Sequence, residues 1–422
     1  MKNKIIILII ISVTISCAGL RKKSVKAIDR SFQSSFFKNQ FTGLLVIDPI
    51  SSDTLYSHNS DHYFIPASNT KIFTLYTALK TLPQNIPALN YLEHNDTLFF
   101  EGTGDPSFLH PYLKDSTAFK FLKHENNLAF YPDNFLDTPM GPGWSWDDYE
   151  WYYAAERNGF PVYGNVVLLY ENPQHTISPN YFADSVINMT NLHNREIHRN
   201  LFYFNSNRKD TLEIPFITKT TTTTAILEHI LKKPIVTVTN MPEGNKKTLY
   251  GIHADSLYVR LMHESDNFIA EQLLMLSSGI LTDTLNSKNA RNYILENDLK
   301  MLPQEPRWVD GSGLSRYNLF TPQSMVYVLN KLYKEVSTDR LFNIFPAIDT
   351  SNPFKNWHSE TGHPYMFAKT GSMSNIYCLS GYLKTESGKI LIFSFMNNNF
   401  RNSSSDLKNR MLNIMEQLRT GY

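Results

Sequence analysis

Three short motifs that occur in a fixed order place the strongest constraint on how this chain folds. Ser68-Asn69-Thr70-Lys71 opens a run with apolar residues at helical spacing, which predicts a helix over residues 68–82. Ser265-Asp266-Asn267 lies between two helical runs, and Lys369-Thr370-Gly371 ends a predicted strand. A fold for this chain must therefore present one motif at a helix start, one between helices and one on a strand.

None of the three motifs is specific enough by itself to indicate a fold or a function. On a helix, residues three apart share a face, so the Lys71 amine can reach the Ser68 hydroxyl. The same S-x-x-K spacing, however, recurs at Ser35, Ser206 and Ser405. The S-x-N pattern also recurs, at Ser57, Ser178 and Ser287, whereas K-T-G occurs once. Their conjunction is the signature of penicillin-binding proteins and class A β-lactamases.

The two ends of the chain predict a mixed α+β core. Apolar and turn patterns favour helices over 25–37 and, capped by Ser405, over 405–418. A hairpin turn is expected around Gly388. The predicted strands span residues 41–48, 54–57, 365–369, 376–384 and 390–396.

The stretch between these ends differs in character and is interpreted as an insertion. Residues 83–245 contain many short strand-like runs, loops rich in Asn and Pro, and the threonine run Thr220–Thr224, for which we expect a strand or a loop leading into a helix. A chain of 422 residues is long enough for two or three domains. We therefore predict a catalytic domain over 21–82 and 246–422, with inserted domains over 83–245.

The N-terminus predicts export from the cytoplasm. Lys2 and Lys4 precede an apolar run that is too short to remain as a membrane-spanning helix, and small or polar residues follow up to Cys17. Residues 1–17 thus resemble a signal segment. Cys17 is a candidate for lipid attachment in the cell envelope, while cleavage after Ala18 is the alternative.

Composition excludes several function classes. The chain has 40 Lys and Arg against 39 Asp and Glu, so no global charge attracts nucleic acid. Cys378 lies in an apolar strand and is expected to be a buried hydrophobic residue. The Gly102-Thr103-Gly104 turn lacks a third glycine for dinucleotide binding, and no H-E-x-x-H zinc motif occurs. We expect neither a metal nor a cofactor.

The motifs together resemble the low-molecular-mass class C penicillin-binding proteins, the D-alanyl-D-alanine carboxypeptidase and endopeptidase family. The first two motifs, at residues 68 and 265, are 197 positions apart, and members of this family carry a large insertion there. Three further stretches fit the family, namely Gly102–Ser107, Trp144–Asp148 and Asp310–Arg316. The resemblance implies a transpeptidase/β-lactamase-like domain, an antiparallel sheet flanked by helices, split by a mostly β insertion.

The chemistry of acyl transfer suits these residue types. A serine hydroxyl becomes a nucleophile when a base takes its proton, and Lys71 can do so if its amine is partly neutral. Burial and a second cation, for which Lys369 is the candidate, both favour a neutral lysine. Ser68 is therefore the expected nucleophile and Lys71 the expected general base.

The resemblance assigns the remaining roles. Ser265 would relay a proton to the leaving nitrogen, and Asn267 would hold the peptide by its amide. Lys369 and Thr370 would bind the terminal carboxylate of the substrate, and Gly371 and Ser372 are further candidates for substrate binding. The backbone N–H groups of Ser68 and Ser372 would form the oxyanion hole.

Related proteins bind the free end of a diamino acid with an acidic and a basic side chain. Asp147, Asp148 and Arg316 are the candidates here. The sequence leaves open whether the activity is carboxypeptidase or endopeptidase action on peptidoglycan peptides. A β-lactamase or esterase on the same fold and a non-catalytic envelope binding protein are the alternatives. Covalent binding of β-lactams is expected, and the oligomeric state is left open.

Overall fold

A computed structural model of the chain describes residues 21–170, 176–205, 207–208, 210–348 and 364–422. The predicted signal segment and Cys17 lie outside these residues. The described chain forms two compact units. The first contains the described residues of 1–72, 301–307 and 318–422, and the second contains residues 73–300 and 308–317. Across the described ranges, no helix combines the length and apolarity needed to span a membrane.

The first unit is built on a six-stranded sheet in which all neighbouring strands are antiparallel. The strand order is β13-β14-β15-β16-β1-β2. The strands are β1 (Phe41–Ile47), β2 (Thr54–His58), β13 (Ala347–Ile348), β14 (Met366–Met373), β15 (Ile376–Lys384) and β16 (Ile390–Asn398). Its helical segments are residues 21–32, α2 (Ser35–Lys38), the 3-10 turn η1 (Ala67–Thr70), α9 (Pro322–Glu335), α10 (Thr338–Ile344) and α11 (Ser404–Gly421).

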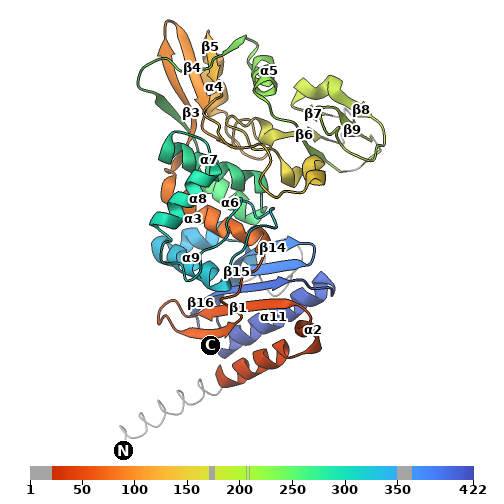
Figure 1. Cartoon of the computed structure of the whole chain (residues 1–422), viewed down its shortest axis with the longest axis vertical. Coiled ribbons are helices and arrows are strands. Elements are labelled where there is room, and N and C mark those ends of the chain that lie inside the picture. Colours follow the sequence, from red (N-terminus) through yellow and green to blue (C-terminus); the bar gives the residue numbers. More distant parts are fainter. Residues whose placement is uncertain (1–20, 171–175, 206, 209, 349–363) are drawn as a thin grey trace, which may run out of the picture. The chain divides into compact units, whose positions relative to one another are not determined.

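Helices cover both faces of this sheet. Phe393 and Leu383 are fully buried in a core that joins the sheet to α11 and to the helical residues 21–32. On the other face, the Tyr382 hydroxyl donates to the Leu329 carbonyl of α9 at 2.9 Å. Figure 1 shows α9 and α11 on opposite sides of the strands. Because both faces are covered, β15 and β16 are buried almost throughout. The predicted antiparallel sheet flanked by helices is confirmed.

Two predicted helices have different ends in the structure. The helix expected over 25–37 is interrupted at Ser34, whose backbone is extended and whose hydroxyl donates to the Ser31 carbonyl at 2.6 Å. Serine competes with helical hydrogen bonding in this way. The last helix is capped by Ser403 and not by Ser405, because the Ser403 hydroxyl accepts the Asp406 N–H at 3.1 Å.

The strand expected over 365–369 is also longer than predicted. β14 continues to Met373 and keeps its pairing with β15 as far as Met373 with Ile376. The chain reverses only at Asn375, which has a φ of 65°. Lys369-Thr370-Gly371 therefore lies inside a strand and does not end one.

The second unit contains a five-stranded mixed sheet of order β11-β5-β4-β3-β12 and two small sheets, β10-β6-β7 and β8-β9. The strands of the large sheet are β3 (Asn85–His94), β4 (Thr97–Gly102), β5 (Leu128–Tyr131), β11 (Ile235–Thr237) and β12 (Lys247–His253). The small sheets use β6 (Val166–Leu169), β7 (Ile177–Ser178), β8 (Val186–Asn188), β9 (Phe202–Phe204) and β10 (Leu212–Pro215).

Helices complete the second unit. They are α3 (Lys71–Thr81), which contains the boundary between the units, α4 (Thr117–His124), α5 (Thr220–Leu231), α6 (Ala254–His263), α7 (Asn267–Thr282) and α8 (Ser287–Asn297). Four 3-10 turns are η2 (Trp146–Glu150), η3 (Tyr152–Ala154), η4 (Tyr163–Asn165) and η5 (Asn180–Ser185). This unit groups α3 and α6 to α8 with residues 83–245, whose status as an insertion stays a prediction.

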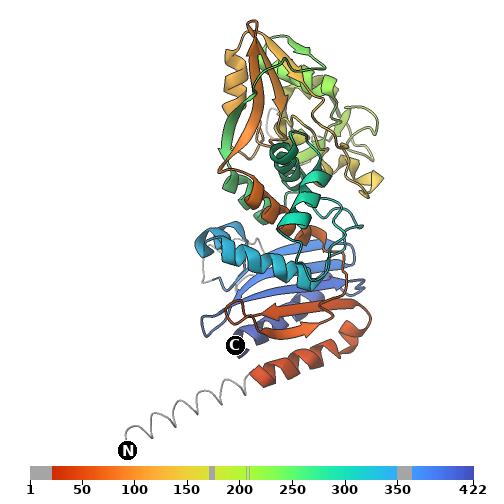
Figure 2. The ribbon, with the colours of Figure 1, turned by 60° about the vertical axis from the view of Figure 1, so that its left-hand side comes forward.

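Aromatic residues dominate the core beside the five-stranded sheet. The rings of Phe100, Phe130 and Phe160 lie 5.2–5.7 Å apart. Figure 2 shows α4 beside the strands of this sheet. The run Thr220–Thr224 forms the first turns of α5 and is neither a strand nor a loop. Burial of the apolar side chains that follow it in α5 outweighs the weak helix preference of threonine.

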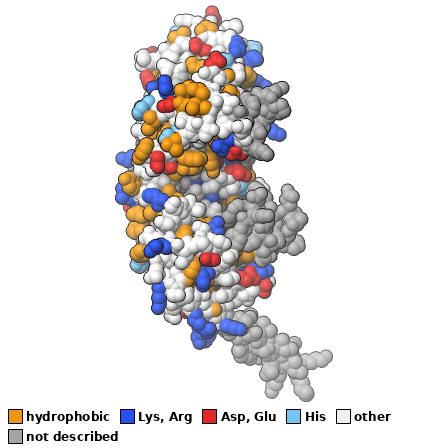
Figure 3. Space-filling model, turned by 90° about the vertical axis from the view of Figure 1, so that its right-hand side faces the viewer, with side chains coloured by type: hydrophobic (Ala, Val, Ile, Leu, Met, Phe, Trp, Pro, Cys, Tyr) orange, Lys and Arg blue, Asp and Glu red, His pale blue; other side chains and the backbone are white. Residues whose placement is uncertain are grey.

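Two predictions from composition concern the interior and the surface. Cys378 is fully buried, and burial raises the pKa of its thiol to about 12, so the thiol stays neutral as expected of a hydrophobic core residue. On the face drawn in Figure 3, the described Lys and Arg side chains are interspersed with Asp and Glu. This mixture agrees with the nearly equal numbers of the two charge types.

The sheet core of the first unit yields a stability prediction. Phe393→Ala removes a fully buried ring from β16, and we expect it to lower the free energy of unfolding by about 3–5 kcal/mol. The matched control is Phe41→Ala in the neighbouring strand β1, where the ring is 62% exposed and a loss of about 0.5 kcal/mol or less is expected. Denaturation by urea, followed by circular dichroism, measures both. Equal losses would contradict this account of the core.

Candidate active site

The turn that carries Ser68 is a 3-10 helix that leads directly into α3. Ser68 lies in η1 and Lys71 is the first residue of α3. Because a 3-10 helix has three residues per turn, side chains three positions apart align with each other. The Lys71 Nζ accordingly lies 3.0 Å from the Ser68 Oγ. The predicted nucleophile and base are therefore in hydrogen-bond contact.

The surroundings of this pair are tightly built. Lys71 is fully buried, whereas Ser68 is partly exposed. Ala67 has a φ of 47°, a left-handed conformation that is unfavourable for a residue with a side chain. The Thr70 hydroxyl donates to the Ala67 carbonyl at 2.9 Å and holds the turn closed. Strained backbone of this kind occurs where the surrounding structure imposes it, often at functional sites.

Strand β14 packs against this turn with almost no space between the two backbones. A Cβ atom added at Gly371 would lie 2.4 Å from the Pro66 carbonyl oxygen and 2.9 Å from the Ser68 nitrogen. The Asn69 side-chain amide donates to the Lys369 carbonyl at 2.9 Å and joins the turn to the strand. The absence of a side chain at Gly371 thus permits the contact between β14 and the Ser68 turn.

Lys369 is the second buried cation near Ser68. It is 1% exposed, and its Nζ donates to the Thr370 carbonyl at 2.9 Å. Burial and the positive charge of Lys71 hold the pKa of Lys369 well below the ordinary lysine value. The charge of one lysine thus makes protonation of the other less favourable, and a lysine that is partly neutral can act as a base.

The first unit therefore brings together the first and third motifs. Ser68, Lys71 and Lys369 form the buried part. Thr370 and Ser372 lie on β14 with intermediate and high exposure, opposite Leu379 and Tyr377 of β15.

The second motif lies in the second unit, between α6 and α7 as predicted. Ser265 has a φ of 55° in the connection. Asp266 has a structural role, because its carboxylate accepts the Ile269 N–H at the start of α7 and pairs with Arg260 at 2.8 Å. The Asn267 side-chain amide donates to the Tyr153 carbonyl at 2.8 Å. Ser265 and Asn267 are thus fixed by the connection between the two helices.

The candidates for binding a diamino acid also lie in the second unit. Asp147 is exposed in η2, and the neighbouring Asp148 accepts the Tyr153 hydroxyl at 2.9 Å. Burial raises the pKa of Asp148, while the Tyr153 hydrogen bond and the charge of Arg316 oppose that rise. Asp148 and Arg316 are therefore within electrostatic reach of each other.

A comparison with protein families identifies the chain. The model of the D-Ala-D-Ala carboxypeptidase 3 (S13) family matches residues 24–215 and 252–420. The chain belongs to this family. The match includes all three motifs and confirms the family that the sequence resembles.

Individual relatives of this S13 protein are distant. The D-alanyl-D-alanine carboxypeptidase DacB of Haemophilus influenzae is 31% identical over 104 residues, which is 24% of this chain and 21% of that protein's own length. The alignment with the crystal structure of penicillin-binding protein 4 (dacB) from H. influenzae spans 93% of this chain and 98% of that protein's chain, with 19% identity and a TM-score of 0.69. The same protein has been solved in complex with a β-lactam. The alignment with a predatory peptidoglycan endopeptidase from Bdellovibrio bacteriovorus spans 90% of this chain and 93% of that protein's chain, with 17% identity and a TM-score of 0.51.

Several residues around the motifs of this S13 chain escaped prediction from the sequence. Asn69 occupies a variable position of S-x-x-K, yet it links the turn to β14. Arg157 and Glu271 are completely buried but look like ordinary surface charges in the sequence. Asp310 lies in the stretch Asp310–Arg316, which fits the family, and this fit is the feature of the sequence that could have indicated a functional role for Asp310.

The close approach at Gly371 yields a prediction about the nucleophile. Gly371→Ala would force β14 away from η1, and we expect acylation of Ser68 by a fluorescent penicillin to slow by about tenfold or more, since small misplacements of reacting groups are costly. The control is Gly388→Ala, which meets nothing within 4 Å but has a φ of 88°. It should lose about 1 kcal/mol of stability and label at the parental rate. Equal labelling of both variants would contradict the proposed packing role.

The lysine pair yields a second prediction. In Lys71→Met the positive charge beside Lys369 is removed, so protonation of Lys369 becomes more favourable and its pKa should rise. Because burial is the larger cause, the pKa should stay below the ordinary lysine value. Carbon-13 NMR of the lysine ε-methylene measures the titration, with Ser68→Ala as a control that keeps Lys71. An unchanged or lower pKa would show that the two amines do not interact.

Proposed function

We propose that this chain is a serine-type D-Ala-D-Ala carboxypeptidase or endopeptidase that acts on peptidoglycan stem peptides through an acyl-enzyme on Ser68. The observation that carries the proposal is the 3.0 Å contact between the buried Lys71 amine and the Ser68 hydroxyl. It occurs in a member of the D-Ala-D-Ala carboxypeptidase S13 family.

The acylation step follows from this contact. Lys71 takes the proton of Ser68, whose Oγ attacks the carbonyl carbon of the penultimate D-Ala. The backbone N–H groups of Ser68 and Ser372 stabilise the oxyanion, a contribution worth about 10²–10³ in rate for one donor. The peptide C–N bond then breaks, Ser265 relays a proton to the leaving nitrogen, and water hydrolyses the ester to release the shortened stem and restore Ser68.

The remaining motif residues bind the substrate. Lys369 and Thr370 take the terminal carboxylate, Gly371 and Ser372 supply the strand along which the peptide lies, and Asn267 holds a substrate amide. Asp147, Asp148 and Arg316 bind the free end of the diamino acid. The mutual electrostatic reach of Asp148 and Arg316 supports a site for a group that carries both an amine and a carboxylate.

Covalent reaction with β-lactams belongs to the same proposal. The H. influenzae penicillin-binding protein 4 has been solved with a β-lactam bound. A β-lactam presents a strained amide carbonyl to the nucleophile, so Ser68 would open the ring and remain acylated for as long as hydrolysis is slow.

We also propose that the protein works in the cell envelope. Proteins similar to this chain are named as a D-alanyl-D-alanine carboxypeptidase and a peptidoglycan endopeptidase, and Lys2 and Lys4 begin a segment typical of export. Lipid attachment at Cys17 would keep the mature protein at a membrane surface.

The test of this function compares two serines that share one motif. Ser68→Ala should abolish labelling by fluorescent penicillin, because the nucleophile is gone. Ser405→Ala, which changes the exposed S-x-x-K serine of α11, should label like the parent. Incubation with cross-linked and uncross-linked muropeptides, followed by mass spectrometry, should show loss of D-Ala or cleavage of cross-links that depends on Ser68.

Each possible outcome decides between functions. A lasting label that requires Ser68 together with peptide cleavage supports the peptidase. A label that disappears within seconds favours a β-lactamase or esterase. Absence of both label and cleavage in the parent favours a non-catalytic binding protein, and labelling of Ser68→Ala would exclude the mechanism altogether.

A further inference from the structure

A buried carboxylate joins the two loops that carry the diamino acid candidates. Asp310 is fully buried, and its Oδ2 accepts the Trp144 indole N–H at 2.9 Å and the Ser315 N–H at 2.6 Å. Its Oδ1 accepts the Gly313 N–H at 2.8 Å. Trp144 precedes Asp147 and Asp148 in one loop, and Ser315 precedes Arg316 in the other. One side chain thus holds both loops in a fixed register.

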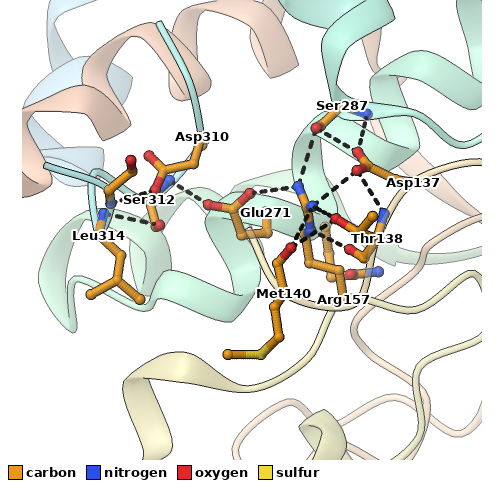
Figure 4. Close-up of polar contacts among 12 residues, drawn as sticks. Asp137, Thr138, Met140, Arg157, Glu271, Ser287, Asp310, Ser312 and Leu314 are labelled. Carbon is orange, nitrogen blue, oxygen red and sulfur yellow. Dashed lines mark hydrogen bonds and ion pairs between the residues drawn. The ribbon is translucent and has the colours of Figure 1, made fainter. Parts of the chain in front are cut away.

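A second buried pair, Arg157 and Glu271, contacts the same two loops at other positions. The Glu271 Oε1 of α7 accepts the Ser312 N–H at 2.8 Å, and its Oε2 lies 3.6 Å from Arg157 Nη1. Arg157 in turn donates to the Thr138 carbonyl at 3.0 Å and pairs with Asp137 at 2.9 Å. Figure 4 shows this continuous line of contacts from Ser312 through Glu271 and Arg157 to Asp137. The loop over 137–148 is therefore anchored at its start by Arg157 and at Trp144 by Asp310.

The two loops also touch through a glycine. Gly143 has a φ of 76°, and a Cβ atom there would lie 2.7 Å from the Ser315 Oγ and 2.5 Å from the Tyr317 ring. This approach keeps Arg316 within electrostatic reach of Asp148. Loss of the Asp310 link would let each loop move separately and widen the spacing of the two charges.

We propose that Asp310 is a positioning residue for substrate selectivity, which sets the spacing between the acidic loop of Asp147 and Asp148 and the basic loop of Arg316. The proposal rests on the proposed function in that these loops bind the diamino acid of the stem. Asp310 itself touches no substrate. A buried carboxylate with three strong N–H donors is well suited to this purpose, because moving any donor leaves a buried charge poorly paired.

The test uses two substrates that differ at one position. Acetyl-L-Lys-D-Ala-D-Ala has a free side-chain amine, and its norleucine counterpart lacks it. In Asp310→Asn an amide NH2 replaces one carboxylate oxygen, so at least one of the three N–H donors loses its acceptor and the remaining ones lose the charge that strengthens their bonds. We expect KM for the lysine peptide to rise about tenfold, the size typical for one charge-assisted hydrogen bond, with kcat changed less than about twofold. KM for the norleucine peptide and the rate of penicillin labelling should stay within about twofold of the parent.

Trp144→Phe provides an independent variant that removes only the indole N–H. It should raise KM for the lysine peptide in the same selective way, and the double variant should lose no more than the larger single effect, since both changes cut one link. Trp146→Phe is the matched control, because Trp146 is 74% exposed in the same loop. It should behave like the parent.

The outcomes separate this inference from the proposed function. Equal rises in KM for both peptides, or additive effects in the double variant, would overturn the positioning role. If Asp310→Asn is unstable, Trp144→Phe decides alone, because it must still raise KM for the lysine peptide without raising KM for the norleucine peptide. Failure of the parent protein to bind penicillin through Ser68 or to cleave either peptide would instead overturn the proposed function.

Discussion

The close approach of β14 to the turn before α3 determines the geometry around Ser68. Hydrogen bonding within the sheet positions β14, and the missing side chain at Gly371 lets its backbone come against the Ser68 turn. In this segment Ala67 has a left-handed backbone conformation and Ala67–Thr70 form a 3-10 helix. That helix aligns Lys71 with Ser68. The contact between the proposed nucleophile and the proposed base therefore depends on strand packing, because the 3-10 turn places side chains three positions apart directly in line.

Burial of two lysines in this region has a stability cost that the sheet must offset. An ammonium group loses hydration when it is buried, and a second one nearby adds repulsion. The apolar strands β15 and β16, with helices on both faces, supply the large hydrophobic core that makes such a cost tolerable. Loss of one proton relieves both penalties at once, so the packing that destabilises the charged form favours the neutral amine that the proposed mechanism requires.

Local patterns predicted most of the elements, and contacts between distant residues account for what they missed. Helix α3 and strands β1, β2, β15 and β16 follow from periodicity and turn residues, whereas the antiparallel sheet flanked by helices is what the family resemblance implies. The extra residues of β14 depend on pairing with β15, which the K-T-G motif itself does not reveal. The link from Asn69 to Lys369 joins residues 300 positions apart, and no pattern within either segment indicates it. In the sequence, Arg157 and Glu271 look like any arginine and glutamate on a protein surface, and only the packed structure shows that they are buried.

The buried charges of the second unit are better understood as devices for geometry than for stability. Replacing a buried ion pair by apolar residues of similar volume is often neutral or stabilising, so Arg157 and Glu271 are poorly explained by the stability they add. Their contacts are directional, however, and they end on backbone groups of two loops: the Ser312 N–H and the Thr138 carbonyl. Apolar side chains could fill the same space but could not specify where those backbone groups lie. The set spacing that we propose for the acidic side chains of Asp147 and Asp148 and the basic side chain of Arg316 gives this protein a reason to keep charges in its interior.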